Sequence, residues 1–301
     1  MTNTLLLTGS SGFIGSNLLK LIKRDSYFGE VLPLKREVSA IGRSNSYEIS
    51  SDHDYSPRLN EVNLLIHAGA WIPRNVSDGN DTEQAKGNIE STRSLLSNKF
   101  PRLKSMILLS SIDVYGPGSS MDEESVPKPQ TSYAQSKYAC EEMVQEWARK
   151  NDVIVQILRI GHTYGRGEEK FAKLIPRNIR RVKLGQNPQI YGDGKDERSF
   201  IHVNDVARAI AESCKLEMSV GPINIASRHT YSTRYVVDQI IKLSGSQLTI
   251  DYMQMMGIGK SINPPITKMQ ELIPVHPISF DQGLKDEIDH FDMNVHSDGH
   301  S

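Results

Sequence analysis

The chain has 301 residues, of which 35 are basic and 36 acidic, so its formal net charge at pH 7 is −1. This balance excludes the strong basic bias of many nucleic-acid-binding proteins, and no apolar run approaches the roughly 20 residues that a membrane-spanning helix needs. The length suits one large α/β domain with or without a smaller lobe. We therefore expect a cytoplasmic protein that binds neither nucleic acid nor a membrane.

Short apolar runs alternate with helical patterns along the first 165 residues. The runs are NTLLLT, EVSAIG, VNLLIHAGA, SMILLSS and VIVQILRI, and helical patterns occupy 88–97 and 133–150. This alternation predicts parallel strands joined by right-handed crossovers. We expect an α/β fold with a Rossmann-type doubly wound parallel sheet at 1–165, a mainly substrate-binding lobe at 166–288 that is free to return segments to the sheet, and a disordered tail at 289–301.

Three glycines, Gly9, Gly12 and Gly15, lie in TGSSGFIG between the first strand and the first helix. Glycine lets the chain turn sharply and lets the backbone approach a pyrophosphate, while the helix N-terminus attracts the negative charge. No Lys-Ser/Thr pair follows the last glycine, which argues against a nucleoside triphosphatase. The pattern therefore predicts a dinucleotide-binding turn.

The second strand is predicted to end at Gly42, and Arg43 follows it. An acid at this position would accept hydrogen bonds from a ribose 2′-hydroxyl, whereas an arginine can pair with a 2′-phosphate. We therefore favour NADP over NAD as the cofactor. The alternative is that Arg43 is only a solvated loop residue.

The chain contains two cysteines, Cys140 and Cys214. They are too few for a disulfide framework and lack metal-site spacing, so we expect free thiols at buried or half-buried positions and no metal site.

Two stretches place a tyrosine four residues before a lysine. They are TSYAQSK, with Tyr133 and Lys137, and YGDGK, with Tyr191 and Lys195. On a helix, side chains at this spacing lie on one face, a single turn apart. A phenol beside an ammonium is a candidate proton donor to a ketone oxygen, but the spacing alone does not decide which of the two pairs matters.

Several motifs in order resemble those of the extended short-chain dehydrogenase/reductase family. They are TGSSGFIG, IHAGA, KGNIEST, LLSSIDVYG, YAQSK, RIGHTYG and GDGKDERSFIHVNDVARAI, and they span nearly the whole chain. Members of this family are NAD(P)-dependent epimerases, dehydratases and reductases that act mostly on nucleotide sugars. The resemblance implies cofactor contacts at Gly9, Ser11, Gly12, Phe13, Ile14, Gly15, Ala68, Gly69, Ala70, Asn88, Tyr133 and Lys137. It also implies a homodimer built from the helices near 85–98 and 133–150.

The resemblance selects the first tyrosine–lysine pair and adds a serine. Tyr133 would protonate the substrate oxygen, and Ser111, at the end of a strand, would donate to the same oxygen. Lys137 and the positive nicotinamide ring would favour the phenolate, and Lys137 would also hydrogen-bond the nicotinamide ribose. Tyr191 and Lys195 lie in a glycine-rich loop, where they are not expected to stack.

The family's 4,6-dehydratases carry an Asp-Glu pair directly after the catalytic threonine or serine. Here Ile112 and Asp113 occupy those positions, so the resemblance disfavours dehydration. Asp113 is either a loop carboxylate or an acid or base at a neighbouring carbon. The family also implies that Arg198 grips the substrate diphosphate, a task that suits a guanidinium.

His162 stands where many epimerases of the family carry an asparagine that binds the diphosphate or the sugar. Its imidazole could donate in place of the amide, or it could be a packed histidine. Some 4-ketoreductases that make deoxysugars have a similar stretch. We therefore predict NADPH-dependent reduction of a 4-keto-deoxysugar nucleotide. A nucleotide-sugar 4-epimerase that retains NAD is the alternative, and a non-catalytic dinucleotide sensor is less favoured.

Overall fold

A computed structural model describes residues 3–34, 58–75, 77–117, 121–254, 261–291 and 293, and the structural statements below concern these residues. The centre of the molecule is a six-stranded sheet in the order β2-β1-β3-β4-β5-β9. Its strands are β1 (Asn3–Thr8), β2 (Phe28–Leu34), β3 (Leu64–His67), β4 (Ser105–Ser111), β5 (Ile154–Ile160) and β9 (Pro222–Ile225). Every adjacent pair is parallel, which confirms the predicted Rossmann-type fold.

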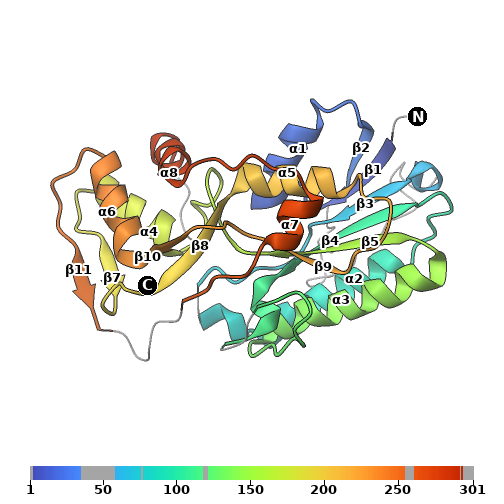
Figure 1. The fold of residues 1–301 in the computed structure, drawn as a ribbon, viewed down its shortest axis with the longest axis horizontal. Coiled ribbons are helices and arrows are strands. Elements are labelled where there is room, and N and C mark those ends of the chain that lie inside the picture. Colours follow the sequence, from blue (N-terminus) through green and yellow to red (C-terminus); the bar gives the residue numbers. More distant parts are fainter. Residues whose placement is uncertain are drawn as a thin grey trace, which may run out of the picture.

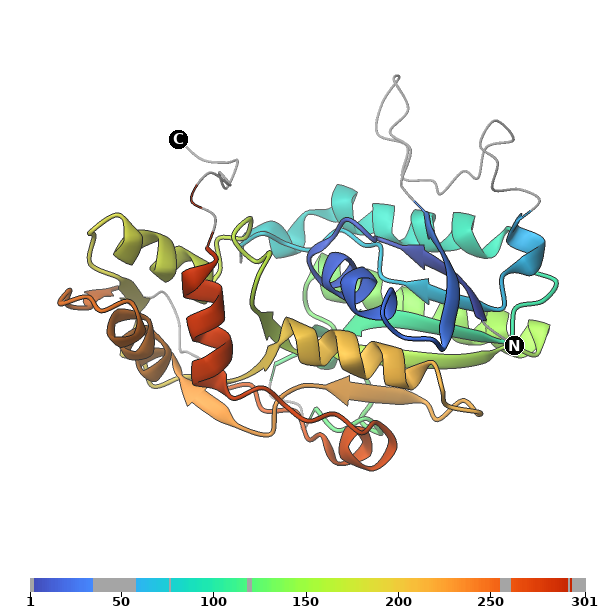
Figure 2. The same cartoon turned by 90° about the horizontal axis from the view of Figure 1, so that it is seen from above.

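Helices cover both faces of this sheet (Figures 1 and 2). They are α1 (Phe13–Ile22) and α5 (Val203–Ser213) on one face, and α2 (Thr82–Leu96) and α3 (Ser132–Asn151) on the other. Side chains alternate along β1, so Leu5 and Leu7 pack with α1 and α5, whereas Leu6 packs in the cluster that contains α3. Burial on both faces explains why the strands read as continuous apolar runs.

A smaller lobe lies beyond the carboxyl edge of the sheet (Figure 1). Its strands are β6 (His162–Tyr164), β7 (Gln189–Tyr191), β8 (Glu197–His202), β10 (Thr230–Ser232) and β11 (Asp251–Met253), and its helices are α4 (Leu174–Lys183), α6 (Thr233–Leu243) and α8 (Phe280–Asp289). Tyr164, Phe200 and Phe280 form the aromatic centre of its core. The remaining elements are short: α7 (Thr267–Leu272), which packs on β9, and the 3-10 helices η1 (Arg58–Glu61), η2 (Ser77–Asn80) and η3 (Ile112–Tyr115).

The second strand lies earlier in the chain than predicted. The second strand in chain order is β2 at Phe28–Leu34, which pairs with β1, and the predicted run at 37–42 lies outside the described residues. The sequence did not predict this strand because it contains Pro33, and a proline lacks the N–H that a sheet ladder needs. Proline is tolerated in edge strands, and β2 is an edge of the sheet within the described residues. Gly42 and Arg43 lie outside the described residues. No helix in the described ranges is long and apolar enough to cross a membrane.

The lobe and the sheet domain are interleaved in sequence. The segment 222–225, which lies within the range expected to form mainly the lobe, returns to the central sheet as β9 beside β5. The helices α5 and α7 accompany it on the sheet domain. The lobe is therefore held by several chain crossings at the edge where ligands of such sheets bind.

Candidate active site

The glycine-rich turn joins β1 to α1 at the point where the strand order reverses. Gly9 has a φ of +69°, a conformation that glycine adopts readily, and a Cβ there would lie 2.6 Å from the Gly69 nitrogen. A Cβ on Gly15 would overlap the Gly9 carbonyl oxygen. The N-cap of α1 is Gly12, which supplies no side-chain hydrogen bond, so N–H groups of the first turn stay open to an anion.

The segment after β3 lies directly against this turn. The Gly69 N–H donates to the Thr8 hydroxyl over 3.0 Å, and Thr8 in turn contacts Nδ1 of His67 at 2.8 Å. The predicted cofactor positions Ala68, Gly69 and Ala70 are thus placed next to Gly9 at one sheet edge. Two close backbone segments and an uncapped helix end fit the pyrophosphate of a dinucleotide.

Ser111 and Tyr133 meet at the ends of β4 and α3. Ser111 is the last residue of β4 and the N-cap of η3, where its hydroxyl accepts from the Asp113 N–H over 3.2 Å. Tyr133 lies in the first turn of α3, which Thr131 caps through the Ala134 N–H. Tyr133 is 7% exposed, and the Ser111 hydroxyl lies close enough to its phenol to lower the pKa of that group. The structure therefore brings the two predicted residues together.

The surroundings of the Tyr133 phenol favour its protonated form. Burial raises its pKa above the ordinary value, and the nearby Asp113 carboxylate raises it further, while Ser111 acts in the opposite direction. Loss of hydration among the surrounding protein atoms also raises the pKa of Asp113, although this side chain still reaches solvent, and Ser111, Lys173 and Arg198 oppose the shift. Among the protein's own groups desolvation therefore dominates, and acidification of the phenol by a bound dinucleotide stays a prediction.

Lys137 follows Tyr133 by one helical turn and is 5% exposed. Its ammonium donates to the Leu109 carbonyl oxygen of β4. Burial lowers the pKa of Lys137, and the neighbouring Cys140 and Glu141 oppose this effect. The ammonium is thus held inside the sheet edge and not in bulk water.

Asn88 of α2 holds the backbone that flanks the phenol. Its side-chain oxygen accepts from the Trp71 N–H at 2.7 Å, and its amide donates to the Trp71 carbonyl at 3.1 Å and to the Ser136 hydroxyl at 3.2 Å. The Trp71 ring meets the Tyr133 ring edge-on, with centroids 6.1 Å apart. This geometry makes Asn88 a positioning residue for the wall of the site, and its predicted cofactor contact stays a prediction.

His162 and Arg198 lie on the lobe side of the same site. Nδ1 of His162 is buried and has no hydrogen-bond partner among the described residues. Burial, with Arg198 and Lys173 adding to it, lowers the pKa of His162 to about 3, so the imidazole is neutral. Arg198 is partly exposed and pairs with Asp196 at 3.2 Å. An unpaired nitrogen beside two cations suits a polar, anionic ligand.

Lys173 is a member of the site that the sequence reasoning missed. It is the N-cap residue of α4, and its ammonium lies 4.8 Å from the centre of the Phe171 ring. Its charge lowers the pKa values of both Asp113 and His162, so it lies within electrostatic reach of both residues. Its local sequence, FAKLIP, shows only a lysine directly before an amphipathic helix and does not indicate its approach to the site.

The remaining sequence predictions can be checked directly. Tyr191 is exposed at the end of β7, and Lys195 follows a turn in which Gly192 and Gly194 have positive φ, so this second pair is not helical, as predicted. Lys195 pairs instead with Asp193 at 3.4 Å. Cys140 and Cys214 are buried free thiols, which confirms the prediction for both. No metal-binding cluster of His, Cys, Asp or Glu occurs in the described ranges.

Two buried carboxyl groups lie near the start of the lobe. Glu287 belongs to α8, and Glu168 belongs to the segment whose Arg166 carbonyl accepts a hydrogen bond from Asn17 of α1. Glu168 and Glu287 are both buried, and Oε2 of Glu168 and both oxygens of Glu287 have no hydrogen-bond partner in the described part of the chain. Burial raises the pKa of Glu168 to about 8, with Lys173 opposing it and Glu169 adding to it. Burial and the charge of Glu168 raise the pKa of Glu287 well above its usual range.

Glu168→Gln is expected to stabilise the protein at alkaline pH. A folded-state pKa above the unfolded value means that the free energy of unfolding falls as pH rises from about 4.5 to about 8. The glutamine removes this slope, so at pH 9 the variant should exceed the wild type by on the order of a few kcal/mol, with a smaller difference at pH 5. Urea unfolding at both pH values measures the effect. Glu217→Gln, at an exposed position, is the control, and parallel pH profiles for Glu168→Gln and wild type would contradict the prediction.

The parallel sheet and the glycine-rich turn define the class of protein, a dinucleotide-dependent enzyme of the Rossmann type. Residues 5–226 match the NAD dependent epimerase/dehydratase family. The chain therefore belongs to this family, among the extended short-chain dehydrogenases/reductases.

Two kinds of relatives are informative. The UDP-N-acetyl-alpha-D-glucosaminuronate decarboxylase of Bacillus cytotoxicus is 28% identical over 97% of this chain and 98% of its own. The structure of MoeE5 in complex with UDP-glucose and NAD is 26% identical, with a TM-score of 0.79 over 95% of this chain and 98% of that one. The UDP-glucose 4-epimerase of Thermotoga maritima has a TM-score of 0.80 at 23% identity over 96% and 98% of the two chains, and supports the fold.

Proposed function

We propose that the protein is an NAD(P)-dependent oxidoreductase of a nucleotide sugar and, more specifically, that it uses NADPH to reduce a 4-keto-deoxysugar nucleotide. The observation that carries this proposal is the buried, protonated phenol of Tyr133 beside Ser111. A carbonyl that receives hydride develops negative charge on oxygen, and a protonated phenol is the form that neutralises it. Ser111 donates to the same oxygen, and the bound dinucleotide supplies the hydride.

The turn of Gly9, Gly12 and Gly15, with Ser11, Phe13 and Ile14, is proposed to hold the dinucleotide. In the sequence, Leu34 at the end of β2 is followed by Lys35, Arg36 and Glu37, which lie outside the described residues. The two basic residues favour a 2′-phosphate and therefore NADP, whereas an acid such as Glu37 suits the ribose 2′-hydroxyl of NAD. The opposing consideration is that MoeE5 was solved with NAD. Titration of the protein with each dinucleotide decides between them.

The lobe side of the site is proposed to bind the diphosphate and the sugar. Arg198 and Lys173 supply two positive charges, and the neutral His162 offers a buried nitrogen without a protein partner. A nucleoside diphosphate needs cationic, hydrogen-bonding groups of this kind. The complex of MoeE5 with UDP-glucose supports a nucleotide sugar as the ligand class.

A nucleotide-sugar 4-epimerase that retains NAD is the second candidate. It is favoured by the solved relatives that carry NAD, because a retained cofactor would oxidise and re-reduce the same carbon through the same Ser111 and Tyr133. Dehydration is less well supported, since Ile112 leaves a single carboxylate, Asp113, after Ser111. A non-catalytic sensor has no need of a buried serine–tyrosine pair. A cytoplasmic homodimer through α2 and α3 remains part of the proposal.

The deciding experiment is an assay with a panel of nucleotide sugars and their 4-keto derivatives. Stoichiometric loss of absorbance at 340 nm with NADPH and a 4-keto sugar supports the reductase. Conversion of a nucleotide sugar without net change in absorbance, by protein that retains NAD through purification, supports the epimerase. Binding of dinucleotide with no turnover on the whole panel would contradict both and favour the sensor.

Arg198→Ala is expected to raise KM for the nucleotide sugar about 10- to 100-fold, because charge-assisted hydrogen bonds contribute about 1.5–3 kcal/mol each. The Kd of the dinucleotide should change little. Arg234→Ala, which removes an exposed arginine on α6, is the matched control. If Arg198→Ala leaves KM unaltered, the substrate carries no diphosphate at this position and is a different kind of ketone.

A further inference from the structure

A cavity lies beside β8, in the region between the smaller lobe and the sheet domain. Its volume is about 590 Å³, and its walls come from β8 and the start of α5, the turn after β9, α7, and the segment 273–280. Within the described ranges, none of the residues assigned above to the dinucleotide, the reaction centre or the substrate lines it. Small-molecule sites have volumes of about 300–1,000 Å³, so the cavity has room for a ligand.

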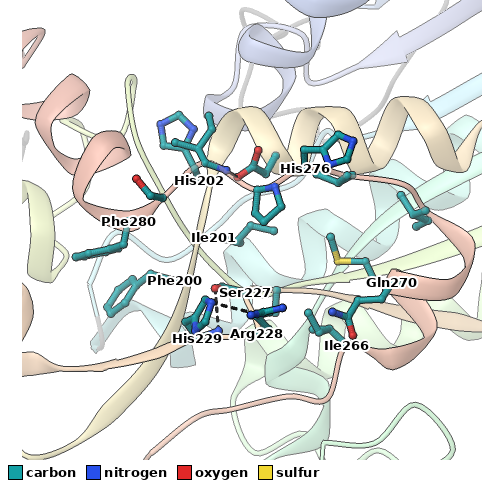
Figure 3. Close-up of a pocket in the computed structure, with 18 of the residues that line it drawn as sticks. Phe200, Ile201, His202, Ser227, Arg228, His229, Ile266, Gln270, His276 and Phe280 are labelled. Carbon is teal, nitrogen blue, oxygen red and sulfur yellow. Dashed lines mark hydrogen bonds between the residues drawn. The ribbon is translucent and has the colours of Figure 1, made fainter.

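Positive and neutral donors dominate the polar part of this cavity. Arg228 and His229 lie on one side of it and His276 on the opposite side (Figure 3). Nε of Arg228 donates to Nε2 of His229 at 3.1 Å, which leaves the two terminal amino groups of Arg228 without a protein partner in the part of the chain described. A guanidinium with a free outer edge matches a carboxylate or a phosphate.

The one acidic side chain in the lining is already neutralised. Asp205 is buried, pairs with Arg208 at 2.9 Å, and accepts the Ile278 N–H at 2.9 Å. It therefore ties the segment 273–280 to α5 and does not oppose a negative ligand. The N-terminal ends of α5 and α8 also border the cavity, and their dipoles add to the attraction for negative charge.

The rest of the lining is apolar. Ile266, Met269, Ile273 and Val275 are among its lining residues. Ile266 and Phe280 lie on opposite sides of the cavity (Figure 3). Apolar surface of this kind stabilises a bound hydrocarbon group by about 25 cal/mol per Å² removed from water. The cavity thus combines a cationic mouth with an apolar interior, which is the complement of an amphipathic anion.

We propose that this cavity binds a small organic anion, with its carboxylate or phosphate at Arg228 and a branched or aromatic body against Met269 and its neighbours. The site is separate from the proposed substrate site but connected to it. The Ser199 hydroxyl donates to the Ser227 carbonyl at 2.6 Å and accepts the Ser227 N–H at 3.0 Å, and Ser199 directly follows Arg198 in β8. The turn that carries Arg228 is therefore tied to the strand that carries the predicted diphosphate ligand.

Calorimetric titration of the full chain, saturated with dinucleotide and UDP to fill the proposed substrate site, tests the inference. Benzoate and phenyl phosphate are the probes, benzamide is the uncharged analogue of benzoate, and inorganic phosphate lacks the apolar body. We expect both aromatic anions to bind at least tenfold more tightly than benzamide or inorganic phosphate. Arg228→Glu should weaken their binding at least tenfold, whereas Arg102→Glu, an exposed charge reversal at the opposite end of the sheet, should not.

Val275→Trp supplies a second test that does not depend on charge. The larger side chain occupies part of the apolar lining where the body of the anion is proposed to lie, so it should weaken probe binding at least tenfold while dinucleotide binding, which reports the folded state, stays intact. The proposal is overturned if no aromatic anion binds at about 1 mM, if benzamide binds as tightly as benzoate, or if both variants bind the anions as the wild type does. Because the substrate site is saturated throughout, failure here leaves the nucleotide-sugar proposal standing.

Discussion

Tyr133→Phe is expected to lower kcat about a hundred- to ten-thousandfold while leaving the Kd of the dinucleotide nearly unchanged. The variant keeps the ring that packs against Trp71 and removes only the hydroxyl beside Ser111. A positioned proton donor contributes about 10²- to 10⁴-fold to a reaction of this kind. Because the phenol is 7% exposed, water cannot readily replace it as the donor.

The other tyrosine that precedes a lysine by four residues is the matched control for this prediction. Tyr191→Phe makes the same chemical change at an exposed position on β7 and should keep kcat within about twofold of the wild type. Steady-state kinetics on both variants, with dinucleotide titrations to verify folding, give the comparison. Equal activity of Tyr133→Phe and wild type would remove the phenol from the reaction and favour a binding protein.

Much of the fold could be predicted because its signals are local. Continuous apolar runs bounded by small residues define β1, β3, β4 and β5, since strands buried on both faces must be apolar along their length. The edge strand β2 was not predicted, because Pro33 and the exposed positions Gly29 and Glu30 interrupt its apolar run. A return of lobe segments to the sheet was allowed for, but the position of β9 was not predicted, because four residues carry no periodicity that identifies their neighbours.

The site was predictable to the extent that spacing determines geometry. Tyr133 and Lys137 are related by one helical turn, and Gly9 and Gly15 by one tight turn, so their proximity follows from the sequence. The opposing shift in the pKa of Tyr133 was not predictable, because it depends on burial and on Asp113, which only the packing of η3 against α3 brings close. Lys173 enters the site from the lobe, and nothing in its local sequence shows that approach.

The buried ion pair beneath the reaction centre is a further product of packing. Glu141 of α3 binds Arg159 of β5 through two hydrogen bonds of 2.8 and 3.1 Å, and both side chains are almost fully buried. The Ser110 hydroxyl donates to the same carboxylate, and the Arg159 guanidinium lies 4.7 Å from the centre of the Tyr115 ring. The pair thus joins α3, which carries Tyr133 and Lys137, to β5. Through Ser110 it also joins α3 to β4, the strand that ends at Ser111.

Glu141→Gln is expected to destabilise the fold by about 3–5 kcal/mol, because it leaves the guanidinium of Arg159 buried without its counter-charge. For a chain of this size that loss lowers Tm by about 10 °C. Since the Glu141 carboxylate also supports the charged form of Lys137, the variant should lower the pKa of Lys137 further and lose activity before it loses structure. Thermal unfolding and kcat, measured well below Tm, separate the two effects.

The double variant Glu141→Leu with Arg159→Met distinguishes the ion pair from simple packing. Removing both charges removes the desolvation of each, so the double variant should be more stable than Glu141→Gln even though it changes two buried residues. Glu146→Gln, which breaks the exposed pair with Lys150 on the same helix, should leave Tm almost unchanged because solvent screens that pair. If Glu141→Gln behaves like Glu146→Gln, the carboxylate is dispensable, and α3 is held on the sheet by its apolar face alone.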